Sequence, residues 1–210
     1  MTANPDPVDA QNRTIADDDA GFVARCRRGD TEAFTVLVRR HQKKMLNIAF
    51  RMIGDYEEAC DVVQEAFLSA YRAIGKFRGD ALFSTWLYGI VLNQSRSRMR
   101  QKAARSRRER ESLDDPAESE NSSFIEGPRS REMSIVEQLE KRELQEKVQE
   151  CIGLLEGEQR EVLVLRDIQG FSYEEIGVML KLREGTVKSR LFRARGALKD
   201  SLLKVLGDLR

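Results

Sequence analysis

Residues 172–198 read SYEEIGVML-KLRE-GTVKSRLFRARGAL, and this stretch decides the fold. Ser172 and Glu175 have the spacing of a capping box, which fixes the start of a helix. The four residues KLRE at 181–184 form a break that is short enough to hold a second helix across the first. The stretch therefore predicts a helix-turn-helix unit.

The second helix of this unit is apolar on one side and cationic on the other. Its apolar residues repeat at helical spacing and are expected to pack inward: Val187, Leu191, Ala194 and Leu198. Residues 181–199 hold seven Lys or Arg and one acid, Glu184. Such a helix suits the major groove of DNA. A solvated amphipathic helix in an ordinary bundle would show the same pattern, so the stretch alone leaves both interpretations open.

Composition excludes several other classes of protein. The chain has 210 residues, enough for one or two domains, and its net charge of +1 means that any basic surface is local. Three cysteines and a single histidine, His41, offer little material for a disulfide framework, a zinc site or histidine-based catalysis. No apolar run approaches the ~18–20 residues of a membrane span, and the polar N-terminus is unlike a signal peptide. We expect a cytoplasmic protein without a cofactor.

A helix predicted at 56–74 begins with a second capping box, Asp55 and Glu58. Its inward face is expected to comprise Ala59, Val62, Val63, Ala66, Phe67, Ala70, Tyr71 and Ile74. Its outward face carries a stripe of three polar residues and one exposed apolar residue: Asp61, Gln64, Glu65 and Leu68. Acids in the first turn favour the helix dipole, but this stripe continues beyond that turn. It is either a solvated face or a surface for a partner.

The loop at 75–83 and the helix after it bring cations close to aromatic rings. Single-stranded nucleic acid requires both, because cations follow the backbone and aromatic faces or pockets accept unstacked bases. The aromatic rings could equally close a small core. The residues that carry this pattern are Lys76, Phe77, Arg78, Phe83, Trp86, Asn93 and Arg96.

Charge and composition divide the chain into two helical domains. Residues 96–110 hold eight Lys or Arg, whereas residues 111–126 hold six acids and no base. The acidic segment, which is also rich in Ser, Asp, Pro and Asn, buries too little apolar surface to fold alone. We predict an all-α fold with a disordered tail at 1–19, a first domain at 20–100, a flexible linker at 101–132 and a second domain at 133–210.

Three motifs, taken in order, resemble those of the extracytoplasmic-function (ECF) group of bacterial sigma-70 family sigma factors. They are DVVQEAF at 61–67, FRGD at 77–80 with STWLY at 84–88, and GTVKSRL at 185–191 with RAR at 193–195. The resemblance implies that residues 20–100 form sigma region 2 and residues 133–210 form sigma region 4. It implies no catalytic residue and no enzymatic activity of the chain alone.

The same resemblance implies a role for each set of residues. The stripe at Asp61–Leu68 would dock on the β′ subunit of RNA polymerase, and the segment from Lys76 to Arg96 would open the −10 element and hold a flipped base. The −35 element would be read by Lys188, Ser189, Phe192 and Arg193, with Arg190 and Arg195 nearer phosphates. Arg183 stands where the family often has proline, so a less rigid start of the recognition helix is expected.

The implied partners are the β′ and β subunits of core RNA polymerase, promoter DNA and an anti-sigma factor, with no small-molecule substrate. One alternative is a stand-alone helix-turn-helix regulator whose N-terminal helical domain senses a signal or dimerises. An enzyme that acts on nucleic acid is a further alternative. Asp61 and Glu65 share a helix face, but no additional carboxylate or histidine motif accompanies them.

Overall fold

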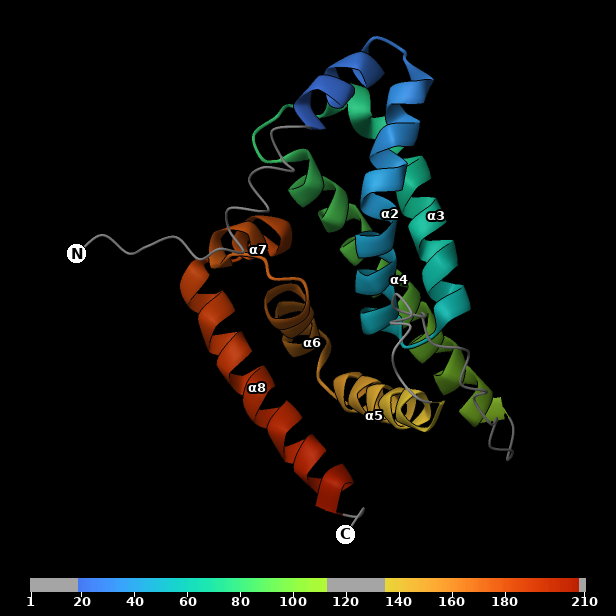
Figure 1. Ribbon diagram of the computed structural model, residues 1–210, viewed down its shortest axis with the longest axis vertical. Coiled ribbons are helices and arrows are strands. Elements are labelled where there is room, and N and C mark those ends of the chain that lie inside the picture. The colour runs from blue at the N-terminus through green and yellow to red at the C-terminus, as the bar shows by residue number, and fades with distance from the viewer. Residues whose placement is uncertain (1–18, 113–134, 208–210) are drawn as a thin grey trace, which may run out of the picture.

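The computed structural model describes residues 19–112 and 135–207, and within these ranges the chain is helical and has no strand (Figure 1). The predicted all-α fold is confirmed. In chain order the elements are a first helix at residues 19–27, α2 (Thr31–Ile53), α3 (Tyr56–Ala73), η1 (Ile74–Lys76), α4 (Phe83–Ser112), α5 (Ile135–Gly153), α6 (Gly157–Leu163), η2 (Val164–Ile168), α7 (Tyr173–Leu180) and α8 (Glu184–Gly207). Apart from Asp19, the tail predicted at 1–19 lies outside the described residues.

The first module, residues 19–112, is a bundle in which α2, α3 and α4 contact one another. The Asp30 carboxylate accepts a hydrogen bond from the Ala33 amide at 3.1 Å, and the Asp55 carboxylate accepts one from the Glu58 amide at 2.9 Å. These caps set the starts of α2 and α3. Gly54 ends α2 with φ 84°, a left-handed conformation that favours glycine.

A buried polar chain ties the first helix to this bundle. His41 on α2 lies between Asp19 and Tyr88, with 2.7 Å from Nε2 to the Asp19 carboxylate and 2.7 Å from Nδ1 to the Tyr88 hydroxyl. All three side chains are buried. Burial, with smaller effects of the Asp19 and Glu175 charges, raises the pKa of Tyr88. The hydroxyl therefore stays protonated and can donate to Nδ1 while the Asp19 carboxylate accepts from Nε2–H.

The second module, residues 135–207, contains the predicted helix-turn-helix. The capping box is confirmed, since the Glu175 amide donates to the Ser172 hydroxyl at 3.1 Å and the Ser172 amide donates to the Glu175 carboxylate at 2.8 Å. Lys181 ends α7 in the left-handed region at φ 56°. The inward residues Val187, Leu191 and Ala194 of α8 are buried, as predicted, and Leu198 is half-buried.

The two modules pack against each other and share one continuous apolar core. In Figure 1, α6 lies between α8 and the first module. Direct contacts join α4 to α7 and α2 to α5 and α6. The sequence predicts a flexible linker from residue 101, whereas α4 continues to Ser112; residues 113–132 lie outside the described part. The domain boundary at residue 100 stays a prediction.

Candidate nucleic-acid interface

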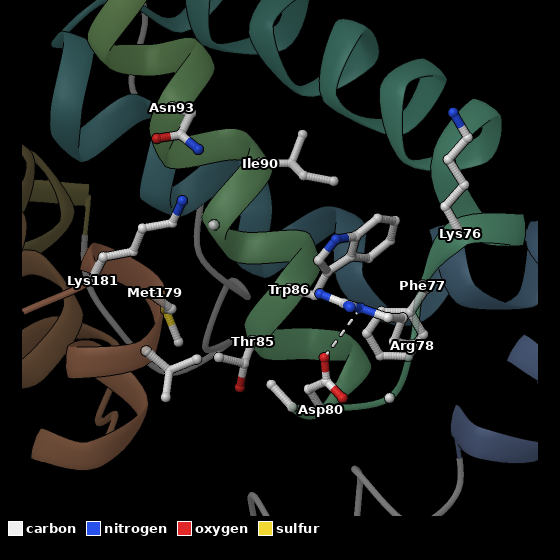
Figure 2. Close-up of a pocket in the computed structure, with 14 residues that line it drawn as sticks. Lys76, Phe77, Arg78, Asp80, Thr85, Trp86, Ile90, Asn93, Met179 and Lys181 are labelled. Carbon is white, nitrogen blue, oxygen red and sulfur yellow. Dashed lines mark ion pairs between the residues drawn. The ribbon is translucent and has the colours of Figure 1, made fainter.

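A cavity of 440 Å³ opens between the loop after η1, the N-terminal half of α4 and the end of α7 (Figure 2). Most of its lining comes from the first module, but Val178, Met179 and Lys181 come from the second. The predicted residues that line it are Lys76, Phe77, Arg78, Trp86 and Asn93. The structure therefore brings five residues of the predicted −10 set to one hollow.

Aromatic rings form one wall of this cavity. The ring centroids of Phe77 and Trp86 are 5.1 Å apart, and those of Phe77 and Phe83 are 5.9 Å apart in an edge-on arrangement. Phe83, which the sequence assigns to the −10 set, is only 5% exposed and packs against Phe77, Trp86 and His41. It supports the cavity from the core and does not offer a face to a ligand.

The cations around the cavity differ in their solvent exposure and in their ion pairs. Lys76 is exposed, and Arg78 is exposed beside Asp80 at 3.4 Å. Arg96 lies further along α4, where it forms a two-armed ion pair with Glu161 of α6, with 2.7 Å between Nη2 and Oε2. Hydrogen bonding to Glu161 raises the pKa of Arg96. Arg96 also donates to the Asn93 side chain at 3.0 Å.

The stripe on α3 is exposed over its whole length. It consists of Asp61, Gln64, Glu65 and Leu68. Leu68 is 49% exposed, and next to it Tyr71 is 46% exposed. The spacing predicts that Tyr71 points inward, and its ring does contact Phe34, with the two ring centroids 5.0 Å apart. The rest of the Tyr71 side chain is exposed and adds apolar surface beside Leu68. Glu65 lies 3.4 Å from Arg98 of α4 in an exposed ion pair.

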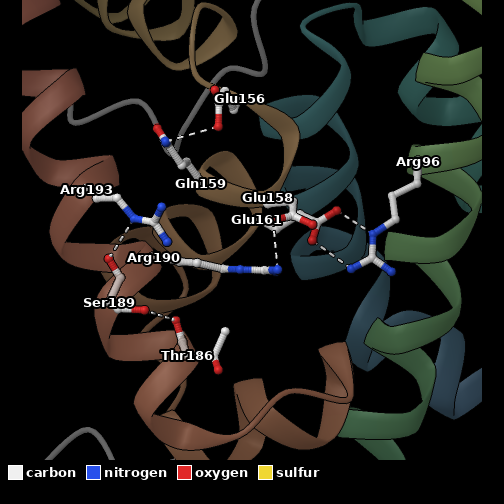
Figure 3. Close-up of polar contacts among 9 residues, drawn as sticks. All are labelled: Arg96, Glu156, Glu158, Gln159, Glu161, Thr186, Ser189, Arg190 and Arg193. Atoms are coloured by element: carbon white, nitrogen blue, oxygen red, sulfur yellow. Dashed lines mark hydrogen bonds and ion pairs between the residues drawn. The ribbon is translucent and has the colours of Figure 1, made fainter.

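The outward face of α8 presents most of the predicted −35 residues to solvent. Lys188, Ser189, Phe192, Arg193 and Arg195 are exposed, as is Arg183 just before the helix, and Phe192 is 80% exposed. Ser189 donates to the Thr186 carbonyl, and Arg193 donates to the Ser189 carbonyl one turn away (Figure 3). A hydrogen bond to Glu184 raises the pKa of Lys188. The face combines cations, a hydroxyl and an exposed aromatic ring.

Two other cations of this set are held by acids of the same module. Arg190 lies 2.7 Å from Glu158 of α6, and Arg195 forms two bonds of 2.9 and 2.6 Å with Asp167 of η2. These pairs fix the edges of α8 against α6 and η2. Both arginines flank the exposed face of α8.

Within residues 19–112 and 135–207, no three His, Cys, Asp or Glu side chains gather as metal ligands would. None of the helices in that part of the chain is both long and apolar enough to cross a membrane.

Two sequence families match the chain. Residues 37–105 match sigma-70 region 2, and residues 145–198 match sigma-70 region 4. The chain is 39% identical over 194 residues to the RNA polymerase sigma-H factor of Pseudomonas aeruginosa, covering 90% of this chain and 96% of that protein. It is 40% identical over 187 residues to the ECF RNA polymerase sigma-E factor of Escherichia coli K12, covering 88% and 94%.

Solved structures with a similar fold include CnrH in complex with the cytosolic domain of CnrY. That likeness has a TM-score of 0.60 and 28% identity, and it covers 88% of this chain and 96% of that one. The sigma factor RpoE in complex with the anti-sigma factor NepR from Bartonella quintana has a TM-score of 0.63 and 23% identity, covering 82% and 98%, and shows the fold alone.

Proposed function

The chain belongs to the ECF group of sigma-70 family RNA polymerase sigma factors, and we propose that its three surfaces divide the work of initiation. A sigma factor binds core polymerase and directs initiation at promoters. One observation carries the division: the three sets of candidate residues lie on separate elements, α3, the Lys76–Arg96 segment and α8. Each set exposes polar side chains next to an apolar or aromatic one.

The α3 stripe is the proposed polymerase-binding surface. Its acids extend past the first turn and lead to the exposed side chains of Leu68 and Tyr71 on the same helix. A patch with an apolar centre and a charged rim is the usual anatomy of a protein interface. We assign it to the β′ subunit, and Tyr71 joins Asp61, Gln64, Glu65 and Leu68 as a contact residue.

The cavity beside Phe77 and Trp86 is the proposed site for an unstacked base of the −10 element. Its aromatic wall offers a ring for stacking, and Asn93 offers hydrogen bonds to a base edge. Lys76 and Arg78 lie at its rim, where they can follow the sugar–phosphate backbone. Arg96 is the proposed phosphate contact further along α4.

The face of α8 is the proposed reader of the −35 element. Lys188, Ser189 and Arg193 supply donors for base edges in the major groove, and the exposed ring of Phe192 suits a thymine methyl group. Arg190 and Arg195 lie at the flanks for phosphates. Phosphate contacts of this kind position the helix, whereas the base contacts give sequence preference.

We also propose an anti-sigma factor as a partner and the cytoplasm as the location. The similar structures of CnrH and RpoE were solved with CnrY and with the anti-sigma factor NepR. Polymerase and promoter DNA are the remaining partners, and the chain alone is not an enzyme.

Run-off transcription with core polymerase and a randomised promoter library tests the proposal. The chain should direct initiation at a subset of templates that share two sequence elements. Failure to direct initiation from any template would contradict it. Dimers that bind a specific operator without polymerase would instead support a stand-alone helix-turn-helix regulator.

A further inference from the structure

The contact between the two modules covers part of the surface that is assigned to the −10 element. We propose that the free chain closes on itself, with Glu161 of the second module holding Arg96 in the place of a DNA phosphate. This closed state rests on the proposed function of Arg96 and of the cavity. It makes the free chain unable to engage the −10 element while its polymerase-binding surface stays open.

We call the contacts that hold the two modules closed the latch. Its first part is the ion pair between Arg96 and Glu161. Glu161 projects from α6 toward α4, while Glu158 on the same helix turns to Arg190 of α8 (Figure 3). The Glu161 side chain is 6% exposed and that of Arg96 is 29% exposed, so the pair is largely shielded from water. A carboxylate with two parallel hydrogen bonds to a guanidinium resembles a phosphate contact in geometry and charge.

The second part of the latch is at the end of α2. Gln149 of α5 donates to the carbonyls of Phe50 and Arg51 at 3.4 Å, and Arg160 of α6 donates to the Met52 carbonyl at 2.6 Å. The Phe50 carbonyl also accepts a hydrogen bond from the Gly54 amide at 2.8 Å, whereas the Arg51 and Met52 carbonyls belong to the last turn, whose carbonyls have no partner within the helix. The second module therefore caps α2 from outside, which makes the contact specific as well as apolar.

The third part lies at the cavity itself. Met179 of α7 and Lys181, the residue after α7, line it, and a Cβ at Gly89 of α4 would stand 4.0 Å from the Met179 carbonyl. Figure 2 shows the Lys181 side chain reaching toward Asn93. A DNA strand that entered this side of α4 would have to displace α7.

Distance along the chain shows that this arrangement cannot read a whole promoter. Lys181 lines the cavity, and Arg195 follows it by two residues before α8 and twelve residues within it, which together span at most about 30 Å. The −10 and −35 elements lie roughly 50–70 Å apart, at one and a half to two turns of ~35 Å. The modules must therefore separate before both surfaces can bind.

Two buried guanidinium groups at the contact between the modules favour its opening. Arg51 and Arg160 lie at the junction, and the Nε atom of each is buried without a hydrogen-bond acceptor among the described residues. Burial lowers the pKa of both guanidinium groups, which reflects the cost of removing them from water. Opening would rehydrate these groups and offset part of the lost contact. Meanwhile Asp61, Gln64 and Leu68 are already exposed, so polymerase can dock before the modules part.

The test uses the full-length free chain and the substitution Glu161→Gln. Glu158→Gln is the matched control, since it removes the same charge from the same helix but pairs with Arg190 of its own module. The probe is a labelled single-stranded oligonucleotide that carries the −10 sequence selected by the holoenzyme in run-off transcription. Anisotropy should show about tenfold tighter binding for Glu161→Gln, because weakening one charge-assisted pair raises the open fraction by about that factor.

Small-angle scattering of the same free proteins gives a second readout. Glu161→Gln should increase the radius of gyration, whereas Glu158→Gln should match the unsubstituted chain; circular dichroism confirms that both stay helical. Equal DNA affinity and equal size for the two variants would overturn the closed state. Arg96→Gln in holoenzyme separates this from the proposed function: if it impairs promoter opening while Glu161→Gln changes nothing in the free chain, the latch fails and the −10 assignment stands.

Discussion

Lys44 of α2 lies over the ring of Phe171, with its ammonium nitrogen 4.2 Å from the ring centroid, and so joins the two modules. Phe171 also packs against Tyr88, with centroids 5.4 Å apart, and is 1% exposed. Burial lowers the pKa of Lys44, with an opposing effect of Glu175. The ring is thus both a core residue and the acceptor of a partly desolvated cation.

Phe171→Ala should lower the free energy of unfolding by about 3–5 kcal/mol, as expected for a large buried ring. Lys44→Met, which keeps the volume and removes the cation, should cost no more than about 2 kcal/mol. Urea denaturation measures both. Phe192→Ala is the matched control: the same change on the exposed face of α8 should shift stability by less than about 0.5 kcal/mol. Similar losses at positions 171 and 192 would contradict the described core.

Gly177 is a place where only a hydrogen fits. An added Cβ would lie 2.9 Å from the Leu182 carbonyl, where the turn of the helix-turn-helix folds back on α7. Gly177→Ala should therefore destabilise the chain by about 1–3 kcal/mol. Gly196→Ala has nothing within 4 Å of its new Cβ and should stabilise α8 by about 0.5–1 kcal/mol. Thermal unfolding should show opposite signs, and a gain at Gly177 would refute the close turn.

Much of the fold follows from local sequence patterns. The caps at Asp55 and Ser172 and the inward residues of α8 depend on neighbours within one or two helical turns, so spacing alone predicts them. Helical spacing predicts less well the orientation of aromatic residues at the edge of an apolar face. The spacing predicts that Tyr71 points inward and that Phe83 faces DNA, yet Tyr71 is 46% exposed and Phe83 is buried, because tertiary neighbours decide which side of an aromatic ring is covered.

The junction between the modules could not be predicted in the same way. Gln149, Arg160 and Glu161 contact residues that lie 65 to 108 positions away, and no periodicity encodes such pairs. A weak signal does exist. Arg160 and Glu161 directly precede the apolar run at 162–165, and both are buried, which requires partners from another element.

Alkaline pH should destabilise the first module through Tyr88. Its pKa is raised in the folded chain, so the stability that its neutral hydroxyl contributes is fully present below the unfolded value near ~10 and is lost as pH rises above it. Tyr88→Phe removes the hydrogen bond to His41 and should cost about 1 kcal/mol at pH 7, but it should lessen the fall in stability between pH ~9 and ~11. An unchanged alkaline slope, measured by urea denaturation, would contradict the buried neutral hydroxyl.

Phe192→Ala should relax sequence preference at one position of the −35 element. The loss of an apolar contact with a thymine methyl should cost about 1–3 kcal/mol at that base pair and little elsewhere. Arg190→Gln, by contrast, should weaken binding to all promoters and reduce the salt dependence of holoenzyme binding, because a phosphate contact carries no sequence information. Binding of holoenzyme to a set of single-base promoter variants measures both effects. A uniform loss for Phe192→Ala would contradict its assignment to a base.

The division of labour between α3 and α8 is tested most directly by measuring core-polymerase affinity and −35 protection for Asp61→Arg and Arg193→Glu in parallel. Both side chains are exposed, so both variants should fold, and Asp200→Arg serves as a charge-matched control for the first. We expect Asp61→Arg to weaken polymerase binding while Arg193→Glu leaves it intact and abolishes −35 protection by holoenzyme. Equal loss of both activities in each folded variant would contradict the assignment of polymerase and −35 DNA to separate surfaces.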